Sequence, residues 1–372
     1  MIREWQEELN GNITKLSEIS EKLNMSPDQE EQLERIARRF PLSVPRYYLS
    51  LIDWSDPEDP IRKMCIPSLD ELEMEGSFDT SGEAQNTVMP GMQHKYNETA
   101  LILSNNQCAM YCRHCFRKRL VGVKEDEIGG DILRMAGYVA DHPQINNVLI
   151  TGGDFLMNSN SQIVQYLEAF CRMDQLDFIR LGSRMPVVLP GRITSDPELL
   201  DILNFYNRRK QLYLITQFNH PNECTPKAKV SIKAIQELGI PVKNQAVLLK
   251  GVNDDSNVLA KLFRSLTSWG IVGHYIFQCR PVRGVGGRFQ VSIKMGCQLV
   301  NDANAKQNGL GKSADYTMSH RSGKIRILGE TEEGKMLFKY QQARNRKDIG
   351  RIFALALEED QCWLPDSNSL PV

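Results

Sequence analysis

The chain has 372 residues, of which 41% are hydrophobic and 24% are charged, so it is long enough to bury one large core with extensions. Its formal net charge is −1, which gives no electrostatic reason to expect nucleic acid or an anionic membrane as a partner. No apolar stretch approaches the ~20 residues of a membrane span, and the first residues lack the apolar centre of a signal peptide, so we expect a cytoplasmic protein.

The first 90 residues are predicted to form a helical N-terminal region. Ser26-Pro27-Asp28-Gln29 has the pattern of a helix start, with Ser as N-cap, Pro at the first helical position and Gln at the capping-box position. This helix should end before Pro41. Residues 74–90 are rich in Gly, Ser, Asp and Thr, which indicates a mobile connector into the main domain.

From residue 100 onward, short β-branched and aliphatic runs alternate with helical periodicity, which is typical of β–α units around a parallel sheet. Strands are predicted at 100–104, 147–151, 178–182, 212–216, 242–249 and 274–278. Helices are predicted between them at about 129–141, 162–173, 196–207, 227–238 and 256–268. We therefore predict an α/β fold in which a partial (β/α)6 barrel over 91–285 is preceded by the helical region 1–90 and followed by an α+β extension over 286–372.

Polar clusters directly follow or lie within the predicted strands. They are Gly152-Gly153-Asp154, Gly182-Ser183-Arg184, Gln217-Phe218-Asn219-His220, Asn244-Gln245 and Arg280. The C-terminal strand ends of such barrels build the active site, so these clusters should converge on one face. Each cluster alone has a simpler interpretation, as a turn or as a buried side chain that satisfies a hydrogen bond.

The most specific motif is the run from Cys108 to Cys115, in which Cys108, Cys112 and Cys115 have C-x3-C-x2-C spacing. Three thiolates can hold a [4Fe–4S] cluster and leave one iron open to a small molecule, whereas four would close it. The alternatives are three ordinary cysteines, or three of four zinc ligands with His114 nearby. The spacing disfavours zinc, because the other cysteines offer no second C-x2-4-C pair. In a reducing compartment, the nine cysteines are expected as thiols and cluster ligands rather than disulfides.

The cysteine segment resembles that of the radical S-adenosylmethionine (SAM) superfamily, and its continuation to Arg119 resembles the lysine 2,3-aminomutase family. The similarity runs through almost the whole chain and includes residues 47–53, 60–63, 182–190, 219–223 and 244–254. The resemblance implies a radical SAM aminomutase, an isomerase that moves an α-amino group to the adjacent carbon. It also implies a [4Fe–4S] cluster on the three cysteines, S-adenosyl-L-methionine at the open iron as the source of a 5′-deoxyadenosyl radical, and pyridoxal 5′-phosphate (PLP) as an imine that carries the nitrogen.

The resemblance also assigns roles to single residues. Arg117 matches the family arginine that binds the substrate carboxylate, a task that suits a guanidinium. Gln217 replaces the first His of the family's His-Phe-Asn-His run, and its amide can still hydrogen-bond. The family's SAM-contacting positions correspond to Gly152, Gly153, Asp154, Ser183, Gln217 and Gln245.

The family's PLP lysine corresponds to Lys324, which ends the segment 319–324. This segment has lost most of the family's glycines, which let backbone N–H groups approach the phosphate, although Ser319, Arg321 and Ser322 could supply donors instead. The family's phosphate-side residues correspond to Lys95, Tyr96 and Thr99, of which Tyr96 is retained and the other two replace arginines. The alternative is that Lys324 is an exposed lysine that opens a strand over 325–328.

The two family aspartates that neutralise the distal ammonium of lysine correspond to Arg280 and Thr317. Because the charge is reversed at Arg280, a cationic substrate end would meet repulsion and desolvation costs of several kcal/mol. We therefore predict an acidic or neutral amino-acid substrate. Glutamate is the simplest choice, since its γ-carboxylate could pair with Arg280 while Arg117 holds the α-carboxylate. The alternative is that Arg280, Arg283 and Arg288 form a structural or phosphate-binding set.

The resemblance further implies a homo-oligomer and an electron donor of the flavodoxin or ferredoxin type. Asp255 stands where the family has a zinc-binding cysteine, so a structural zinc is not expected. Two other functions stay open at this point. One is a PLP-independent radical SAM dehydratase or epimerase that acts on a small carboxylate or phosphate substrate, and the other is a non-catalytic iron–sulfur sensing protein.

Overall fold

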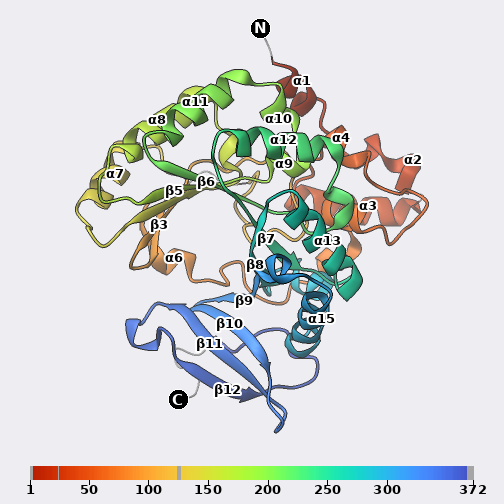
Figure 1. The fold of residues 1–372 in the computed structure, drawn as a ribbon. Helices are drawn as coiled ribbons and strands as arrows, with labels where there is room; N and C mark the ends of the chain where they lie inside the picture. Colours follow the sequence, from red (N-terminus) through yellow and green to blue (C-terminus); the bar gives the residue numbers. More distant parts are fainter. Residues whose placement is uncertain (1–2, 24, 124–126, 367–372) are drawn as a thin grey trace.

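A computed structural model describes residues 3–23, 25–123 and 127–366 and places their strands in one mixed sheet (Figure 1). Within these residues the strands pair in chain order, so each lies beside its neighbours in the sequence. They are β1 (Thr87–Met89), β2 (Met92–Tyr96), β3 (Thr99–Leu103), β4 (Asn147–Thr151), β5 (Phe178–Gly182), β6 (Gln211–Thr216), β7 (Val242–Leu248), β8 (Val272–Gln278), β9 (Asp315–His320), β10 (Gly323–Glu330), β11 (Lys335–Ala343) and β12 (Ile352–Ala356).

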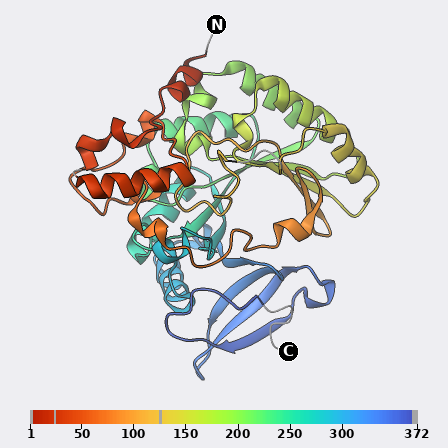
Figure 2. The same ribbon diagram turned by 180° about the vertical axis from the view of Figure 1, so that it is seen from behind.

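The predicted α/β fold with a partial barrel is confirmed. Strands β3 to β8 run parallel and match the six predicted strands, and the sheet stays open, with β1 and β12 as its edges. The α-helices are α1 (Glu4–Asn10), α2 (Ser20–Leu23), α3 (Pro27–Arg39), α4 (Arg46–Leu49), α5 (Pro60–Cys65), α6 (Glu83–Asn86), α7 (Ile132–Ala140), α8 (Asn160–Cys171), α9 (Met185–Val188), α10 (Gly191–Thr194), α11 (Pro197–Asn207), α12 (Pro226–Glu237), α13 (Ser256–Ser268), α14 (Gly286–Phe289) and α15 (Ile293–Ala305). Figure 2 shows the N-terminal helices packed on one side of the barrel and the C-terminal strands below it.

Side chains of the parallel strands alternate between two environments, as the period of two in a strand requires. One set, which includes Ile150 and Leu181, is fully buried in the hydrophobic core. The alternate set, which includes Leu149, Arg180 and Tyr213, faces the barrel interior and lines a cavity there. The barrel therefore places a second set of side chains, from inside the strands, next to those at the strand ends.

Helix α3 begins and ends as predicted. Ser26 Oγ accepts from the backbone N–H of Gln29 at 3.3 Å, and the Gln29 side chain accepts from the backbone N–H of Ser26 at 3.0 Å. This reciprocal capping box fixes the first turn, and the helix ends at Arg39, before Pro41. The buried residues of α3, Leu33 and Ile36, belong to the main core.

Residues 74–90 differ from the mobile connector that their composition predicts. They contain α6 and β1, and Ser81 and Glu83 are buried. The Asp79 carboxylate accepts from the backbone N–H groups of Glu83 at 2.7 Å and Ala84 at 3.1 Å, which caps the start of α6. The Gly- and Ser-rich composition therefore reflects tight turns against the barrel rather than a loose linker.

The C-terminal extension joins the barrel directly. Helix α15 connects β8 to β9, which adds a parallel strand beyond the six predicted, and Phe277 of β8 pairs with Thr317 of β9. Strand β10 begins at Gly323 rather than after Lys324, and Lys324 pairs with Ser319 of β9. Because β9 is bonded to the last barrel strand, the extension brings Lys324 to the barrel interior.

One hydrophobic cluster runs through all three regions, since Trp5, Ile150 and Phe338 belong to it. In the described parts of the chain, no helix combines the length and the apolar character that a bilayer crossing needs. The division of the chain into domains at residues 90 and 285 stays a prediction.

Glu71 is a fully buried carboxylate that holds three cations. Arg113 Nε donates to it at 2.8 Å, Lys118 Nζ at 2.5 Å and Arg288 Nη1 at 3.4 Å. Burial alone would raise the pKa of Glu71, but the charges of Arg113 and Lys118 lower it to about 2. Since Arg113 and Lys118 flank Cys115, this carboxylate anchors the cysteine loop to the N-terminal region.

We expect Glu71→Gln to lower the free energy of unfolding by about 3–5 kcal/mol, because it leaves buried cations without their counter-charge. Urea unfolding measures the effect, with Asp70→Asn as the control, since Asp70 is exposed and lies 3.9 Å from Arg288. The folded-state pKa is depressed, so this stabilisation should be complete above pH ~4.5 and be lost as the pH falls through about 2. Equal stability of the two variants would contradict the anchoring role.

Candidate active site

The barrel interior contains a cavity of about 700 Å³ that nearly all the predicted site residues line. Its walls come from the barrel strands, from the segment before β3 and from β10. The predicted residues on this lining are Lys95, Tyr96, Cys108, Cys112, Cys115, Arg117, Gly152, Gly153, Asp154, Ser183, Gln217, Gln245, Arg280 and Lys324. The fold therefore unites residues from both halves of the chain in one cavity.

Thr317 is the predicted site residue that the structure does not bring to this cavity lining. It is fully buried in β9, and its hydroxyl donates to the carbonyl of Asp315 at 3.2 Å. Because Thr317 is fully buried and does not line the cavity, its side chain does not face a ligand there. Thr317 therefore drops out of the predicted substrate contacts, and Arg280 stays.

The three cysteines lie in the segment between β3 and α7, which backbone hydrogen bonds fix to the N-terminal region. Tyr111 N–H donates to Ser43 O at 2.9 Å, and Arg113 N–H donates to Met64 O at 2.9 Å. Burial raises the pKa of Cys108, and it raises that of Cys115 to about 11. These thiols therefore become thiolates at neutral pH only when a cationic group binds them.

The Gly-Gly-Asp segment after β4 packs backbone to backbone against the start of the cysteine segment. Gly153 N–H donates to Asn105 O at 2.7 Å, and Asp154 N–H donates to Gln107 O at 2.8 Å. Gly152 has a φ of +129°, and a Cβ on Gly153 would lie 2.1 Å from Gln107 O. Both positions therefore require glycine, because any side chain would separate the two loops.

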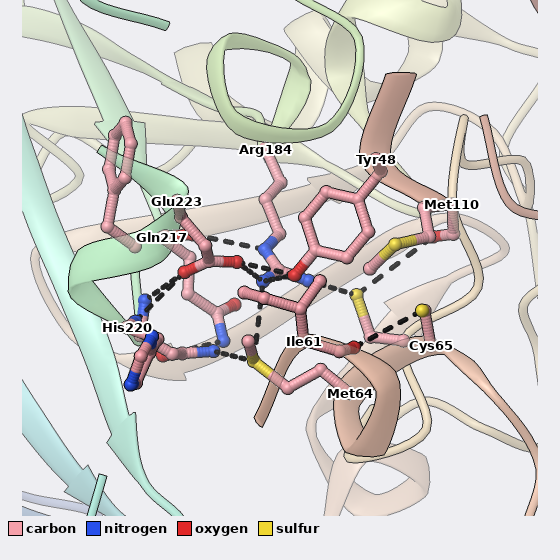
Figure 3. Close-up of polar contacts among 12 residues, drawn as sticks. Tyr48, Ile61, Met64, Cys65, Met110, Arg184, Gln217, His220 and Glu223 are labelled. Atoms are coloured by element: carbon pink, nitrogen blue, oxygen red, sulfur yellow. Dashed lines mark hydrogen bonds and ion pairs between the residues drawn. The ribbon is translucent and has the colours of Figure 1, made fainter. Parts of the chain in front are cut away.

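Arg184, which follows β5, contacts the segments that follow β3, β4 and β6. Figure 3 shows its side chain near Gln217, Glu223 and Tyr48. Its backbone N–H donates to one oxygen of Asp154 at 2.6 Å, and Leu156 N–H donates to the other at 2.9 Å. Its side chain donates from Nη1 to Cys112 Sγ at 2.7 Å and from Nε to Gln217 O at 3.0 Å. These hydrogen bonds fix the segments after β3, β4, β5 and β6 in place relative to one another.

Gln217 lies against His114, which stands between two of the cysteines. Gln217 Nε2 is 3.1 Å and Asn219 Nδ2 is 3.3 Å from His114 Nε2. Since both amide groups donate, Nε2 accepts, and the pattern assigns the ring proton to Nδ1. Burial holds the pKa of His114 well below its usual value, so the ring is neutral at neutral pH. Gln217 therefore orients His114 beside the cysteines.

Two arginines lie on the ring of Phe116, the residue that follows Cys115. The guanidinium carbon of Arg117 is 4.6 Å and that of Arg280 is 4.2 Å from the ring centroid. Arg117 Nε donates to Glu83 at 3.1 Å, and Arg280 Nη1 donates to Ser81 Oγ at 2.9 Å. Burial would raise the pKa of Glu83, but the neighbouring arginines lower it to about 2. The α6 segment thus supplies a polar partner to each arginine.

The Lys324 amine reaches into the cavity and lies 4.2 Å from the ring centroid of Tyr275. Burial lowers the pKa of Lys324 to about 7, and the charges of Arg180, Lys95 and Arg280 add to this effect. Among the described residues no carboxylate lies within ion-pair distance to counter it. This arrangement favours a neutral amine near pH 7, which is the form that acts as a nucleophile.

The sequence comparisons agree with this geometry. Residues 102–263 match the family model of the Radical SAM superfamily. An Aquifex aeolicus protein named "Putative L-lysine 2,3-aminomutase" is 38% identical over 347 residues, which cover 92% of this chain and 92% of that protein. The chain belongs to the lysine 2,3-aminomutase family.

Two further relatives carry two different substrate names. The L-lysine 2,3-aminomutase of Acetoanaerobium sticklandii is 34% identical over 82% of this chain and 73% of its own length. The Glutamate 2,3-aminomutase of Clostridioides difficile is 32% identical over 82% of this chain and 71% of its own length. This member of the lysine 2,3-aminomutase family is therefore a radical SAM aminomutase, an isomerase, rather than a non-catalytic sensing protein.

Membership implies a [4Fe–4S] cluster and SAM as cofactors, and the residues fit them. No three His, Cys, Asp or Glu side chains in the described ranges stand close enough to hold a single metal ion. A cluster does not need such a close approach, because each thiolate binds a different iron atom. Cys108, Cys112 and Cys115 would hold it, and because burial disfavours free thiolates at Cys108 and Cys115, the cationic irons suit these two as partners. When bound, the cluster and SAM supply a carbon-centred radical, which needs an electron donor and a small-molecule substrate.

Sequence reasoning overlooked several titratable residues that line the cavity. Arg180 of β5, Lys243 of β7 and His274 of β8 lie inside strands rather than at their ends, and Glu83 lies in the segment expected to be mobile. The signal that could have found the first three is a basic residue at an alternate position of an otherwise apolar strand. Such a residue must face an interior that holds an anionic ligand or solvent.

Proposed function

We propose that this aminomutase moves the α-amino group of glutamate, or of a similar short acidic amino acid, to the β-carbon, with PLP held on Lys324. The observation that carries the proposal is the Arg280 guanidinium, which lies in the same cavity as Arg117 and on the same Phe116 ring. One arginine suits the α-carboxylate that every amino acid has, and the second suits a carboxylate at the other end of the substrate.

The charge of the cavity supports anionic ligands. The lining includes the cationic side chains of Arg117, Arg180, Arg184, Lys243 and Arg280 and the basic side chains of Lys95 and Lys324, whose pKa values are lowered to about 7. The carboxylates on it are Glu83 and Asp154, and each already accepts hydrogen bonds from the protein: Glu83 from Arg117, and Asp154 from the backbone N–H groups of Arg184 and Leu156. A phosphate and two substrate carboxylates would balance this excess of positive charge, whereas a substrate with a second ammonium would add to it.

The separation of the two arginines suits a short dicarboxylate. The guanidinium carbons of Arg117 and Arg280 lie 4.6 Å and 4.2 Å from the Phe116 ring centroid. The distance between the two carbons therefore cannot exceed the sum of these two values. The carboxylate carbons of extended glutamate are about 5 Å apart, as four carbon–carbon bonds dictate. One glutamate molecule could therefore reach Arg117 and Arg280 at the same time, and the named glutamate 2,3-aminomutase relative supports this choice of substrate.

The residues around Lys324 fit PLP. The buried Nε–H of Arg180 has no hydrogen-bond acceptor among the described residues, although its Nη2 donates to Asn147 at 2.6 Å. A phosphate beside Arg180, Lys95 and the buried Tyr96 hydroxyl would provide acceptors and a counter-charge. These side chains would take the place of the loop glycines that segment 319–324 lacks. When bound, PLP supplies the π-system through which the migrating nitrogen can pass.

The side chains of this chain then have separable tasks. Arg117 and Arg280 bind and orient the two ends of the substrate, so that its β-carbon stays fixed while the nitrogen moves. Tyr275 and Phe277 cover the amine of Lys324, at 4.2 Å and 5.8 Å from their ring centroids, and exclude water from it. We further propose that a cytoplasmic flavodoxin or ferredoxin delivers the electron, which dithionite can replace in the assay.

The test is an anaerobic assay of the reconstituted protein with SAM, PLP, dithionite and isotope-labelled amino acids. We expect labelled β-glutamate from glutamate and no β-lysine from lysine, as measured by mass spectrometry of the derivatised products. The lack of any β-amino acid across the acidic and neutral amino acids would contradict the proposal. A product that forms equally well without PLP would instead support a PLP-independent reaction.

A further inference from the structure

The Arg184 side chain connects a cluster cysteine to a buried carboxylate (Figure 3). Its Nη1 donates to Cys112 Sγ at 2.7 Å, while its Nη2 donates to Glu223 Oε1 at 2.5 Å. Its Nε is held by the carbonyl of Gln217 at 3.0 Å, and Nη2 also lies 3.4 Å from Tyr48 Oη. A planar guanidinium with these contacts has one orientation, and that orientation directs an N–H group at the sulfur.

Glu223 is itself locked in place. It is fully buried, and its Oε1 accepts from Tyr48 Oη at 2.7 Å as well as from Arg184. Its Oε2 accepts from the backbone N–H groups of Asn219 at 2.6 Å and His220 at 3.0 Å. Each carboxylate oxygen therefore has two donors, so Glu223 fixes the position of Arg184 and compensates part of its charge.

We propose that the Arg184–Glu223 pair sets the reduction potential of the cluster through the hydrogen bond to the Cys112 thiolate. Reduction adds one negative charge to the cluster, and a cationic donor on a ligand sulfur stabilises the reduced form more than the oxidised form. Arg184 therefore raises the potential, and Glu223, on the far side of the guanidinium, lowers it. Arg184 and Glu223 are positioning residues that act through Cys112.

The proposal predicts shifts of opposite sign for the two partners. In Arg184→Gln the equilibrium constant for one-electron reduction of the cluster should fall at least tenfold, which corresponds to 59 mV. In Glu223→Gln it should rise, because the charge of Arg184 is no longer compensated. The double variant Arg184→Gln/Glu223→Gln should return toward the wild type. Tyr48→Phe, which removes a hydrogen bond but no charge, should change the constant less than threefold.

The measurement is a redox titration of the reconstituted protein without SAM, followed by electron paramagnetic resonance of the reduced cluster. Iron and sulfide content identifies variants that hold a complete cluster, and Arg209→Gln, which removes a half-exposed arginine on the surface, controls for handling. If Arg184→Gln does not assemble a cluster, the other two variants still test the proposal. The equilibrium constant for reduction should then rise in Glu223→Gln and change little in Tyr48→Phe.

Three results would overturn it. The first is a wild-type potential in every variant that holds its cluster, and the second is shifts of the same sign in Arg184→Gln and Glu223→Gln, which a distorted loop would produce. The third is an unchanged potential together with weaker SAM binding in Arg184→Gln, as measured by equilibrium dialysis. That result would assign Arg184 to SAM rather than to the cluster.

Discussion

Lys324→Ala is expected to reduce product formation by about 10³-fold or more, because the proposed attachment point of PLP is lost. It should also remove the pyridoxyl-lysine adduct that borohydride traps in the wild type, which peptide mass spectrometry locates. Lys324→Arg serves as the matched control, because it keeps a long basic side chain beside Tyr275 but has no amine that can bind a carbonyl. Both variants should keep a full complement of iron and sulfide. A wild-type rate in Lys324→Ala, or an adduct on Lys95 instead, would contradict the assignment.

The same lysine should give a distinctive pH dependence. With a pKa of about 7, the neutral fraction of Lys324 rises from about one tenth at pH 6 to about nine tenths at pH 8. The rate of adduct formation with added PLP should therefore rise about ninefold over this range and then level off. For a lysine with an ordinary pKa of 10.5, the rate would keep rising about tenfold per pH unit through pH 8. Stopped-flow absorbance at several pH values distinguishes the two profiles.

The buried amine of Lys324 should also lower the free energy of unfolding of the wild type near pH 7. The folded-state pKa of Lys324 is lowered, so the unfolded chain binds more protons between about pH 7 and 10.5, and wild-type stability rises with pH through that range. Lys324→Ala should therefore unfold at a higher temperature than the wild type near pH 7, and the difference should shrink toward pH 10. Calorimetry at these pH values checks the sign. A lower unfolding temperature for the variant would indicate that the packing of Lys324 outweighs its charge.

The barrel could be predicted from sequence because each of its parts has a local cause. The apolar residues of β4 and β5 are enough to predict these strands. Ser26 and Gln29 predict the start of helix α3. The cysteine spacing likewise carries its chemistry within eight residues. These features do not depend on where distant segments lie, so they can be predicted without knowledge of the fold.

The rest of the site depends on partners that are far apart in the chain. Glu83 reads as a surface residue of a loose segment, and only the fold shows that Arg117 and Arg119 bind it. A basic residue inside an apolar strand indicates that Arg180 faces the barrel interior, but only the fold shows that it lies near Lys324. Thr317 matches a substrate position of the family, yet its hydroxyl is used within β9.

The arginines that sequence reasoning grouped as one alternative set have separate environments. Arg288 pairs with Glu71, and Arg283 is exposed and donates to the carbonyl of Gly76 at 3.0 Å. Of these three, Arg280 lines the cavity. The structure thus separates a structural arginine and a surface arginine from the one that can meet a substrate.

Arg280→Gln is therefore expected to lower kcat/KM for glutamate by about 10²- to 10³-fold, because the γ-carboxylate would lose its charged partner inside the cavity. Arg283→Gln, in the same loop but exposed, is the matched control and should stay within about twofold of the wild type. The measurement is the rate of β-amino acid formation under anaerobic conditions at limiting substrate. Deoxyadenosine release and cluster content in the same samples show whether the SAM site is intact.

A second substrate distinguishes the loss of γ-carboxylate binding from a general disruption of the cavity. Glutamine has nearly the shape of glutamate but no γ-carboxylate, so Arg280→Gln should change its kcat/KM much less than that of glutamate. The ratio of the two substrates should shift toward glutamine by at least tenfold, because the substitution removes a preference for charge and not the catalytic groups. An equal loss for both substrates would mean that Arg280 supports the cavity through Ser81 and Phe116 rather than binding the substrate. That result would contradict the proposal of an acidic substrate but not the assignment of the protein as an aminomutase.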